Sequence, residues 1–153
     1  MLFRSRRIAD LAAGSGLCGL AALRCGASAA TALEIDPFAV EAIGLNARAN
    51  GLRLRVVGRD LLDGAPPEVD VILAGDWAYE AELAARVLGF LRRAAAAGIE
   101  VLVGDPGRAH LPTESLEPLA VYEVRTSTEL EDADRKTGTV YRLRSPVPTS
   151  PNR

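Results

Sequence analysis

The chain has 153 residues, 48% of them hydrophobic, and a formal net charge of −2. This length and apolar content predict one domain with a genuine hydrophobic core. The small net charge and the scattered arginines argue against a basic surface for non-specific nucleic-acid binding.

The sequence predicts neither a membrane span, nor a disulfide, nor a metal site. No apolar run approaches the roughly 20 residues of a membrane span and no signal-peptide segment precedes the first predicted strand, so we expect a cytoplasmic protein. Cys18 and Cys25 lie two helical turns apart, too far for a disulfide, and we expect both in the core. His110 is the only histidine and no cysteine pair has metal spacing, so no metal site is predicted.

A glycine motif follows the first predicted strand, residues 8–13, and opens a helix over residues 16–24. In Gly14-x-Gly16-x-x-Gly19, we expect the first glycine to permit the tight turn and the second to let a ligand approach bare backbone. The third lets the helix pack closely on its strand. This sequence of strand, glycine turn and helix predicts a nucleotide-type ligand.

Two carboxylates indicate which nucleotide. Glu34 follows the next apolar run at the spacing of a ribose contact. Asp10, inside the first strand, would repel a pyrophosphate by on the order of 4 kcal/mol at 4 Å and an effective dielectric of 20. Since S-adenosylmethionine instead carries an ammonium and a sulfonium, Asp10 favours that ligand over a dinucleotide.

The remaining elements alternate between strands and helices, which predicts an α/β fold with a mostly parallel, doubly wound sheet and helices on both faces. We expect Asp36 to cap a helix that begins at Pro37 and runs to about residue 50. The other predicted elements are an edge strand at 52–57, strands at 29–35, 69–74 and 100–103, a helix at 80–97, a short helix within 111–119, an antiparallel pair at 120–128 and 137–144, and a disordered tail at 145–153.

Acidic residues stand at or just past the ends of four of these strands. Parallel strands place their carboxyl ends on one edge of the sheet, where ligands bind. We therefore expect five carboxylates to converge there on a cationic ligand, although each taken singly is as well explained as a turn or helix cap. They are Asp10, Glu34, Asp36, Asp60 and Asp76.

These residues resemble a class I S-adenosylmethionine-dependent methyltransferase of the Rossmann-like type. More narrowly, the chain is similar to the electron-transfer-flavoprotein β-subunit lysine methyltransferases and their bacterial relatives. The motifs that carry the resemblance are Asp10-Leu-Ala-Ala-Gly-Ser-Gly-Leu-Cys-Gly19, Glu34-Ile-Asp-Pro37, Asp76-Trp-Ala-Tyr79 and Gly104-Asp-Pro-Gly-Arg108. The resemblance implies a seven-stranded sheet whose last strand is antiparallel, with residues 1–144 as the methyltransferase core.

The resemblance also implies roles for single residues. Asp10, Gly14 and Gly16 would hold the methionine part of S-adenosylmethionine, and Ala12 and Asp36 would also belong to the cofactor site. Glu34 would bind the ribose hydroxyls, Asp60 and Leu61 would lie at the adenine, and Asp76 and Tyr79 would face the methyl acceptor. Alternatives from the residues remain open: Asp76 as a helix cap, Trp77 and Tyr79 as packing residues, and Arg108 as either a substrate contact or, preferably, part of a turn.

The sequence departs from the family pattern at three points. Glu34 stands where aspartate is usual, and Ala78 stands where phenylalanine is common. The family's N-terminal helical segment, which covers the cofactor, is expected to be missing, and we expect reduced activity in its absence.

The leading hypothesis is N-methylation of a protein lysine, with the electron-transfer-flavoprotein β-subunit as a candidate partner and neither nucleic acid nor membrane involved. Two alternatives are methylation of a small nicotinamide-like amine and a catalytically silent cofactor-binding domain. An Asn/Asp-Pro-Pro-Tyr motif is absent after residue 74, which argues against amide or adenine methylation. A nicotinamide-dinucleotide oxidoreductase is disfavoured by Asp10.

Overall fold

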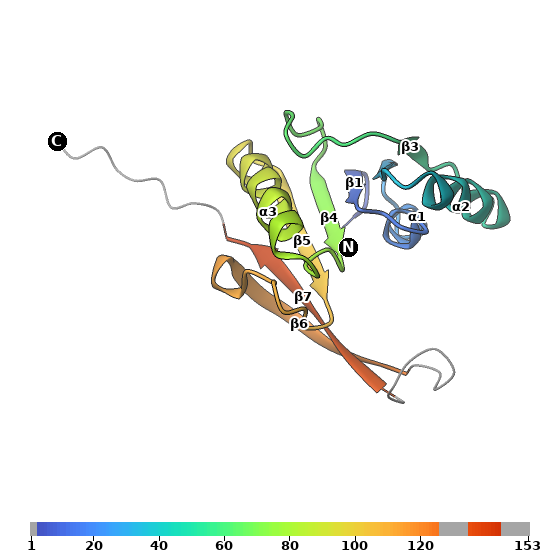
Figure 1. Ribbon diagram of the computed structural model, residues 1–153. Helices are drawn as coiled ribbons and strands as arrows, with labels where there is room; N and C mark the ends of the chain where they lie inside the picture. Colours follow the sequence, from blue (N-terminus) through green and yellow to red (C-terminus); the bar gives the residue numbers. More distant parts are fainter. Residues whose placement is uncertain (1–2, 126–134, 145–153) are drawn as a thin grey trace.

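The computed structural model describes residues 3–125 and 135–144 and contains a single central sheet flanked by helices (Figure 1). The strands are β1 (Arg7–Leu11), β2 (Ala29–Leu33), β3 (Arg55–Val57), β4 (Val71–Gly75), β5 (Glu100–Asp105), β6 (Leu116–Arg125) and β7 (Arg135–Leu143). The helices are α1 (Leu17–Arg24), α2 (Pro37–Ala49) and α3 (Ala81–Ala96), with a 3₁₀ turn at Thr113–Ser115.

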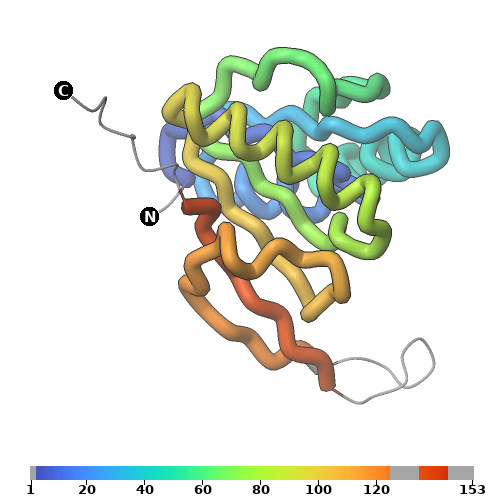
Figure 2. The backbone as a smooth tube through the Cα atoms, turned by 60° about the vertical axis from the view of Figure 1, so that its left-hand side comes forward, coloured from blue at the N-terminus to red at the C-terminus, as the bar shows by residue number. Residues whose placement is uncertain are grey.

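The seven strands lie in the order β3-β2-β1-β4-β5-β7-β6. Neighbours from β3 to β5 are parallel, whereas β7 runs antiparallel to both β5 and β6. This confirms the predicted mostly parallel sheet with a C-terminal antiparallel pair, and it confirms residues 55–57 as an edge strand. In Figure 2 the β6–β7 hairpin extends away from the layer of helices.

Helices cover both faces of the sheet, as predicted. Successive residues of one strand enter different clusters: Val71 packs with Ala22 of α1, whereas Ile72 packs with Phe90 of α3. Such alternation between two apolar clusters is what a parallel strand buried on both faces requires. α1 and α2 lie next to each other beside β1 to β3, and α3 crosses β4 and β5 (Figures 1 and 2).

The chain builds β1, β2 and β3 outwards in one direction and then returns to place β4 on the other side of β1. This reversal is the switch point at which the loops after neighbouring strands diverge and leave a crevice at their carboxyl ends. The topology therefore assigns the ligand site to the loops that follow β1, β2, β3 and β4.

Two expectations about the elements are wrong in part. The predicted helix within residues 111–119 is only the 3₁₀ turn at Thr113–Ser115, because Leu116 already pairs with Leu143 in the sheet. Cys18 and Cys25 are both exposed, not core residues, because α1 packs on the sheet through Leu20 and Ala22 instead. Residues 126–128 of the predicted strand and the predicted tail at 145–153 lie outside the described residues.

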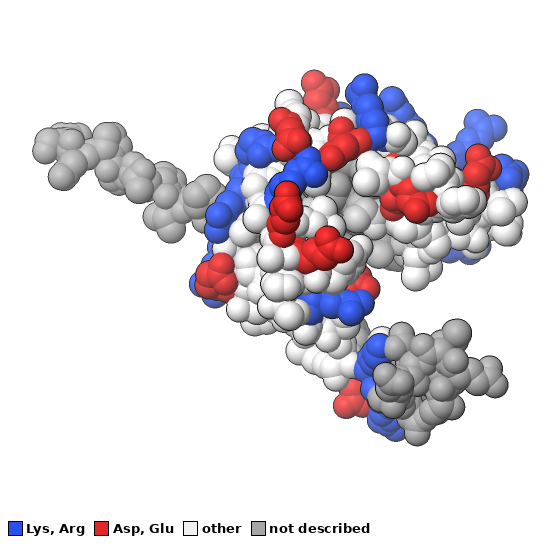
Figure 3. All heavy atoms as spheres, viewed as in Figure 1, with Lys and Arg blue, Asp and Glu red and all other residues white. Residues whose placement is uncertain are grey.

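Charges of both signs are interspersed on the face seen in Figure 3, where acidic side chains gather around the hollow between α3 and the α1–α2 side. No continuous basic stripe crosses the described part of that face. Within residues 3–125 and 135–144, no helix is long and apolar enough to cross a membrane. Across the same ranges, no group of histidine, cysteine and acidic side chains has a metal-binding arrangement.

Candidate active site

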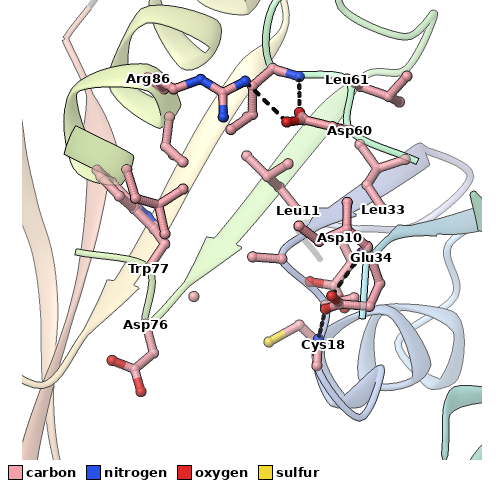
Figure 4. A pocket seen from close by; sticks show the side chains of 18 of the residues that line it. Asp10, Leu11, Cys18, Leu33, Glu34, Asp60, Leu61, Asp76, Trp77 and Arg86 are labelled. Carbon is pink, nitrogen blue, oxygen red and sulfur yellow. Dashed lines mark hydrogen bonds and ion pairs between the residues drawn. The ribbon is translucent and has the colours of Figure 1, made fainter. Parts of the chain in front are cut away.

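A cavity of about 650 Å³ opens at the carboxyl edge of the sheet, at the switch point between β1 and β4 (Figure 4). Its volume lies within the range of roughly 300–1,000 Å³ that is usual for small-molecule sites. Residues from four post-strand loops and from α1 and α3 line it: Asp10 to Ser15, Leu17, Cys18, Leu33 to Ile35, Arg59 to Leu62, Gly75 to Trp77, Tyr79, Leu83, Arg86 and Val87. Four of the five predicted carboxylates thus share one cavity, and Asp36 is not among its lining residues.

Asp10 is a buried carboxylate at the base of the cavity, with only 2% of its surface exposed. Its Oδ2 accepts a hydrogen bond of 2.7 Å from the backbone N–H of Gly19 at the start of α1. Burial raises the pKa of Asp10 to about 7; the Gly19 N–H lowers it, and the negative charge of Glu34 raises it further. No positively charged side chain among the described residues bonds to this carboxylate, and a cationic ligand would favour its ionised form.

Glu34 turns back across the cavity wall and accepts three backbone hydrogen bonds. Its Oε2 accepts from Gly14 N at 2.7 Å, and its Oε1 accepts from Ile35 N at 2.8 Å and from Asp36 N at 2.9 Å. These bonds tie the loop after β2 to the glycine turn after β1. Because a carboxylate oxygen has more than one acceptor direction, Oε2 can also accept a ligand hydroxyl.

Asp60 lies at the far end of the cavity in Figure 4, next to Leu61 and Arg86. Its Oδ1 accepts from Leu62 N at 2.8 Å and its Oδ2 from the Arg86 guanidinium at 3.0 Å. The Leu62 N–H, followed by the Arg86 hydrogen bond, lowers the pKa of Asp60. The sequence predicted Asp60 and Leu61 here but did not reveal Arg86, which lies on α3 between Leu83 and Val87, on the side of the helix that lines the cavity.

Asp76 follows β4 on the opposite wall, and its carboxylate points toward the open edge of the cavity (Figure 4). It does not cap α3, whose N-cap residue is Glu80. Instead, Arg108 donates from Nε to Oδ1 at 2.6 Å and from a terminal nitrogen to Oδ2 at 2.9 Å. The Arg108 hydrogen bonds are the main cause of the lowered pKa of Asp76.

The two aromatic residues after Asp76 behave differently. Trp77 is 1% exposed, and its ring reaches under α3 into the core (Figure 4), so the packing role holds for this residue. Tyr79 is 53% exposed and lines the cavity, with the Arg108 guanidinium carbon 5.9 Å from its ring centre. Tyr79 and Asp76 therefore lie on the same wall with one arginine between them.

Gly14 has a positive φ of 52°, as expected of the glycine that permits the tight turn. The second glycine of the motif does not lie where a ligand was expected to approach it. Gly14 lines the cavity, and a Cβ there would meet nothing within 4 Å. Gly16 has φ +78° and faces inward, where a Cβ would lie 3.1 Å from Ile43 and Leu54; it is the N-cap of α1 and does not line the cavity. Gly16 is thus needed by the backbone and the core. Gly14 is needed by the turn and is also the glycine that leaves room for a ligand. Ala12 also has a positive φ, of 53°, a strained conformation of the kind that clusters at functional sites.

Asp36 acts as the cap that the sequence predicts. Its Oδ1 accepts from Phe38 N at 2.7 Å and from Ala39 N at 3.0 Å, and Pro37 takes the first turn of α2. Replacing Asp36 with alanine is expected to lower the free energy of unfolding by about 1 kcal/mol, as measured by urea denaturation. Asp36→Ser retains a capping oxygen and should restore that stability. A loss of cofactor affinity in the serine variant would assign Asp36 to the ligand as well.

Cys18 was not predicted to be near the ligand, yet its sulfur reaches the cavity from α1 (Figure 4). Desolvation, followed by the negative charge of Asp10, raises the pKa of the Cys18 thiol to about 11. The thiol is therefore neutral at physiological pH and is not an activated nucleophile. Its place one residue before Gly19 in the glycine motif is the sequence signal that could have revealed it.

The chain resembles known proteins over most of its length. Residues 2–87 match the family model described as ribosomal protein L11 methyltransferase (PrmA). It is 37% identical over 146 residues to the electron transfer flavoprotein beta subunit lysine methyltransferase of Xenopus laevis, which covers 92% of this chain and 59% of that protein. The corresponding human protein is 31% identical over 144 residues, which cover 90% of this chain and 55% of that protein. The chain thus spans somewhat more than half the length of these relatives.

Solved structures support the fold. A ribosomal protein L11 methylase from Lactobacillus delbrueckii subsp. bulgaricus superposes with a TM-score of 0.63 at 20% identity, over 92% of this chain and 71% of that one. The family match covers more than half of the sequence, and the glycine turn and the strand-end carboxylates lie within the matched residues. The chain belongs to the class I S-adenosylmethionine-dependent methyltransferases, in the family described as ribosomal protein L11 methyltransferase (PrmA).

Proposed function

We propose that the chain binds S-adenosylmethionine in the cavity at the switch point and transfers its methyl group to a lysine of a protein. The observation that carries the proposal is the arrangement of carboxylates around that cavity. Asp10, Glu34 and Asp60 lie at or just past the ends of three strands, and Asp76 lies just past the end of a fourth. We assign Asp10, Glu34 and Asp60 to the methyl donor, and we assign Asp76 to the amine that accepts the methyl group.

The residues present fit the donor on chemical grounds. Asp10 is a buried carboxylate with a raised pKa and no positive partner in the contacts described above, which suits an ammonium or a sulfonium nearby. Glu34 joins the glycine turn to the loop after β2, and the family resemblance implies that it binds the ribose. The open space at Gly14 allows the methionine part to pass close to the backbone. Asp60 and Leu61 then border the position of the adenine.

S-adenosylmethionine, when bound, supplies a methyl carbon whose bond to sulfur breaks as the acceptor nitrogen attacks. The task left to the protein is to deliver a neutral amine in line with that bond. An ordinary lysine with a pKa near 10.4 must lose a proton at a cost of roughly 4 to 5 kcal/mol at pH 7. Asp76 has a lowered pKa and is therefore a weak base, so we assign it the orientation of the amine, with the proton leaving through water.

A protein acceptor is favoured by the relatives. The relatives named above are, by name, methyltransferases of the electron transfer flavoprotein beta subunit and of ribosomal protein L11. We propose the electron transfer flavoprotein beta subunit as the first candidate acceptor, because its methyltransferases match about nine tenths of this chain at 31 to 37% identity. Tyr79, half exposed beside Asp76, provides an apolar surface for the methylene chain of the lysine.

The test combines binding and transfer. Calorimetry with S-adenosylmethionine and with S-adenosylhomocysteine measures donor binding, and mass spectrometry after incubation with purified electron transfer flavoprotein, ribosomal protein L11 or a mixture of small amines locates the methyl group. A methylated lysine on either protein supports the proposal. Methyl groups found only on small amines would establish the small-molecule alternative, and donor binding without transfer to any acceptor would establish a silent domain. Self-methylation can be read at one position, because Lys136 is the only lysine of the chain.

A further inference from the structure

Arg108 makes a contact that joins two loops of the site. It belongs to the turn after β5, where Asp105 Oδ1 accepts from Gly107 N at 2.6 Å and from Arg108 N at 2.7 Å. This turn directs the guanidinium back across the sheet edge to Asp76, 32 residues earlier in the chain, with two hydrogen bonds of 2.6 and 2.9 Å. The backbone N–H of Arg108 thus stabilises the turn, as the sequence suggested. Its side chain binds Asp76 on the side of the cavity that we assign to the methyl acceptor.

The surroundings of Asp76 are positively charged. Arg108 binds both carboxylate oxygens from the loop after β5, and Lys136 on β7 adds a further positive charge close enough to act on the same carboxylate. Tyr79 contributes its ring from the segment before α3. The pair is also open to an incoming side chain, since 44% of the Arg108 side chain and 53% of the Asp76 side chain are exposed.

A carboxylate without such partners would work against the proposed reaction. Opposite charges within about 4 to 6 Å favour each other's charged forms, so a bare Asp76 would hold an acceptor lysine as an ammonium, which has no lone pair for attack. A carboxylate paired with arginine has almost no net charge to offer. Each of its oxygens still has a second acceptor direction for an N–H of the neutral amine.

We propose that Arg108 is a positioning residue that neutralises Asp76, so that the acceptor lysine is held beside the methyl donor as a neutral amine. The inference rests on the proposed function and deepens it. The lone pair of the amine nitrogen forms the new N–C bond, the electrons of the broken C–S bond remain on sulfur, and the positive charge passes from the sulfonium to the methylated nitrogen. The proton lost before attack goes to water, and Arg108 transfers none.

The first experiment measures binding and does not depend on turnover. With S-adenosylhomocysteine present, calorimetry records the affinity of n-butylamine at pH 7 and pH 9 for the wild type and for Arg108→Gln, which keeps the backbone N–H of the turn. The wild type should bind the amine more tightly at pH 9, where more of it is neutral. The variant should bind several-fold more tightly than the wild type at pH 7 and lose this pH dependence, because its bare carboxylate attracts the cation. Equal affinities at both pH values, or no amine binding by either protein, would overturn the inference.

The second experiment measures methyl transfer against pH with the protein acceptor. In Arg108→Gln the rise of kcat/KM with pH should move upwards by about one pH unit, and Arg108→Lys should restore its position. Arg142→Gln is the matched control: Arg142 also binds a carboxylate, that of Glu100, at the opposite end of β5, and Arg6 still pairs with Glu100 after the change. This control should leave the profile in place.

The outcomes separate the inference from the proposed function. Faster turnover in Arg108→Gln with an unmoved pH profile would mean that Arg108 only competes with the acceptor, and would refute the positioning role. A uniform loss of kcat without a shift would indicate that Arg108 merely holds the loop. If the wild type transfers no methyl group to any acceptor, the proposed function fails, while the pH dependence of amine binding still decides the role of Arg108.

Discussion

Replacing Asp76 with asparagine is expected to lower kcat/KM for methyl transfer by about 100-fold or more, with S-adenosylmethionine still bound. Asparagine is the informative substitution because Asp76 has a positive φ of 49°, a conformation that asparagine adopts more readily than alanine. The variant keeps an acceptor oxygen on the wall but loses the carboxylate that Arg108 binds through both oxygens. Misorientation of the amine by even about 1 Å is enough for a loss of this size.

The control for this loss is Glu123→Gln. Glu123 is an exposed carboxylate that also pairs with an arginine, Arg135, at 3.0 Å on the β6–β7 hairpin. It is not among the residues that line the cavity. Single-turnover kinetics with the protein acceptor, together with calorimetry of S-adenosylhomocysteine, separate transfer from binding. Turnover of Asp76→Asn within about threefold of the wild type, at equal folding and cofactor affinity, would remove Asp76 from the reaction.

Replacing Asp10 with asparagine is expected to have two opposite effects, of which the first is on stability. The carboxyl group of Asp10 has an ordinary pKa of 3.8 in the unfolded chain and a pKa of about 7 in the folded protein. The folded state therefore binds this proton more tightly, and the wild type loses stability as the pH rises from about 4 to about 7. At about 1.4 kcal/mol per pKa unit, the full penalty above pH 7 is on the order of 4 kcal/mol.

Asparagine removes this penalty because it never ionises, and its side-chain oxygen can still accept the hydrogen bond from Gly19 N. The ligand-free variant should thus be more stable than the wild type at pH 8 by roughly 2 to 4 kcal/mol, with a difference that shrinks toward pH 4. Urea unfolding at several pH values measures the effect. A variant that is less stable than the wild type at pH 8 would contradict the assigned burial penalty.

The second effect is a loss of cofactor affinity. A neutral residue gives no electrostatic attraction to an ammonium or sulfonium, so S-adenosylmethionine should bind Asp10→Asn at least about tenfold more weakly at pH 8. In the wild type the affinity should rise between pH 6 and pH 8 as Asp10 ionises, and in the variant it should not. Asp63→Asn serves as the control, since Asp63 is exposed and pairs with Arg86 without lining the cavity. A cofactor affinity unchanged by Asp10→Asn would exclude Asp10 from the site.

Part of the site could be predicted because it depends on chain direction and local pattern. Asp10, Glu34, Asp60 and Asp76 each stand at a strand end, and the carboxyl ends of parallel strands share one edge, so their meeting in one cavity follows from the order of the elements. The cap at Asp36 is equally local, because its partners lie two and three residues further on. The sequence did not decide whether the Trp77 side chain is buried, because the direction of its ring depends on how α3 packs on the sheet.

The sequence by itself determined the α/β class, the alternation of strands and helices, the glycine turn and the strand-end carboxylates, because periodicity and turn chemistry act over a few residues. Only the tertiary structure decided that Gly16 faces Ile43 and Leu54, that Cys18 reaches the cavity, and that Arg86 and Arg108 bind Asp60 and Asp76 from 26 and 32 residues away. Each of these contacts joins segments of the chain that follow different strands of the sheet. Such contacts depend on how the sheet twists and how the helices pack on it, which no local stretch of sequence specifies.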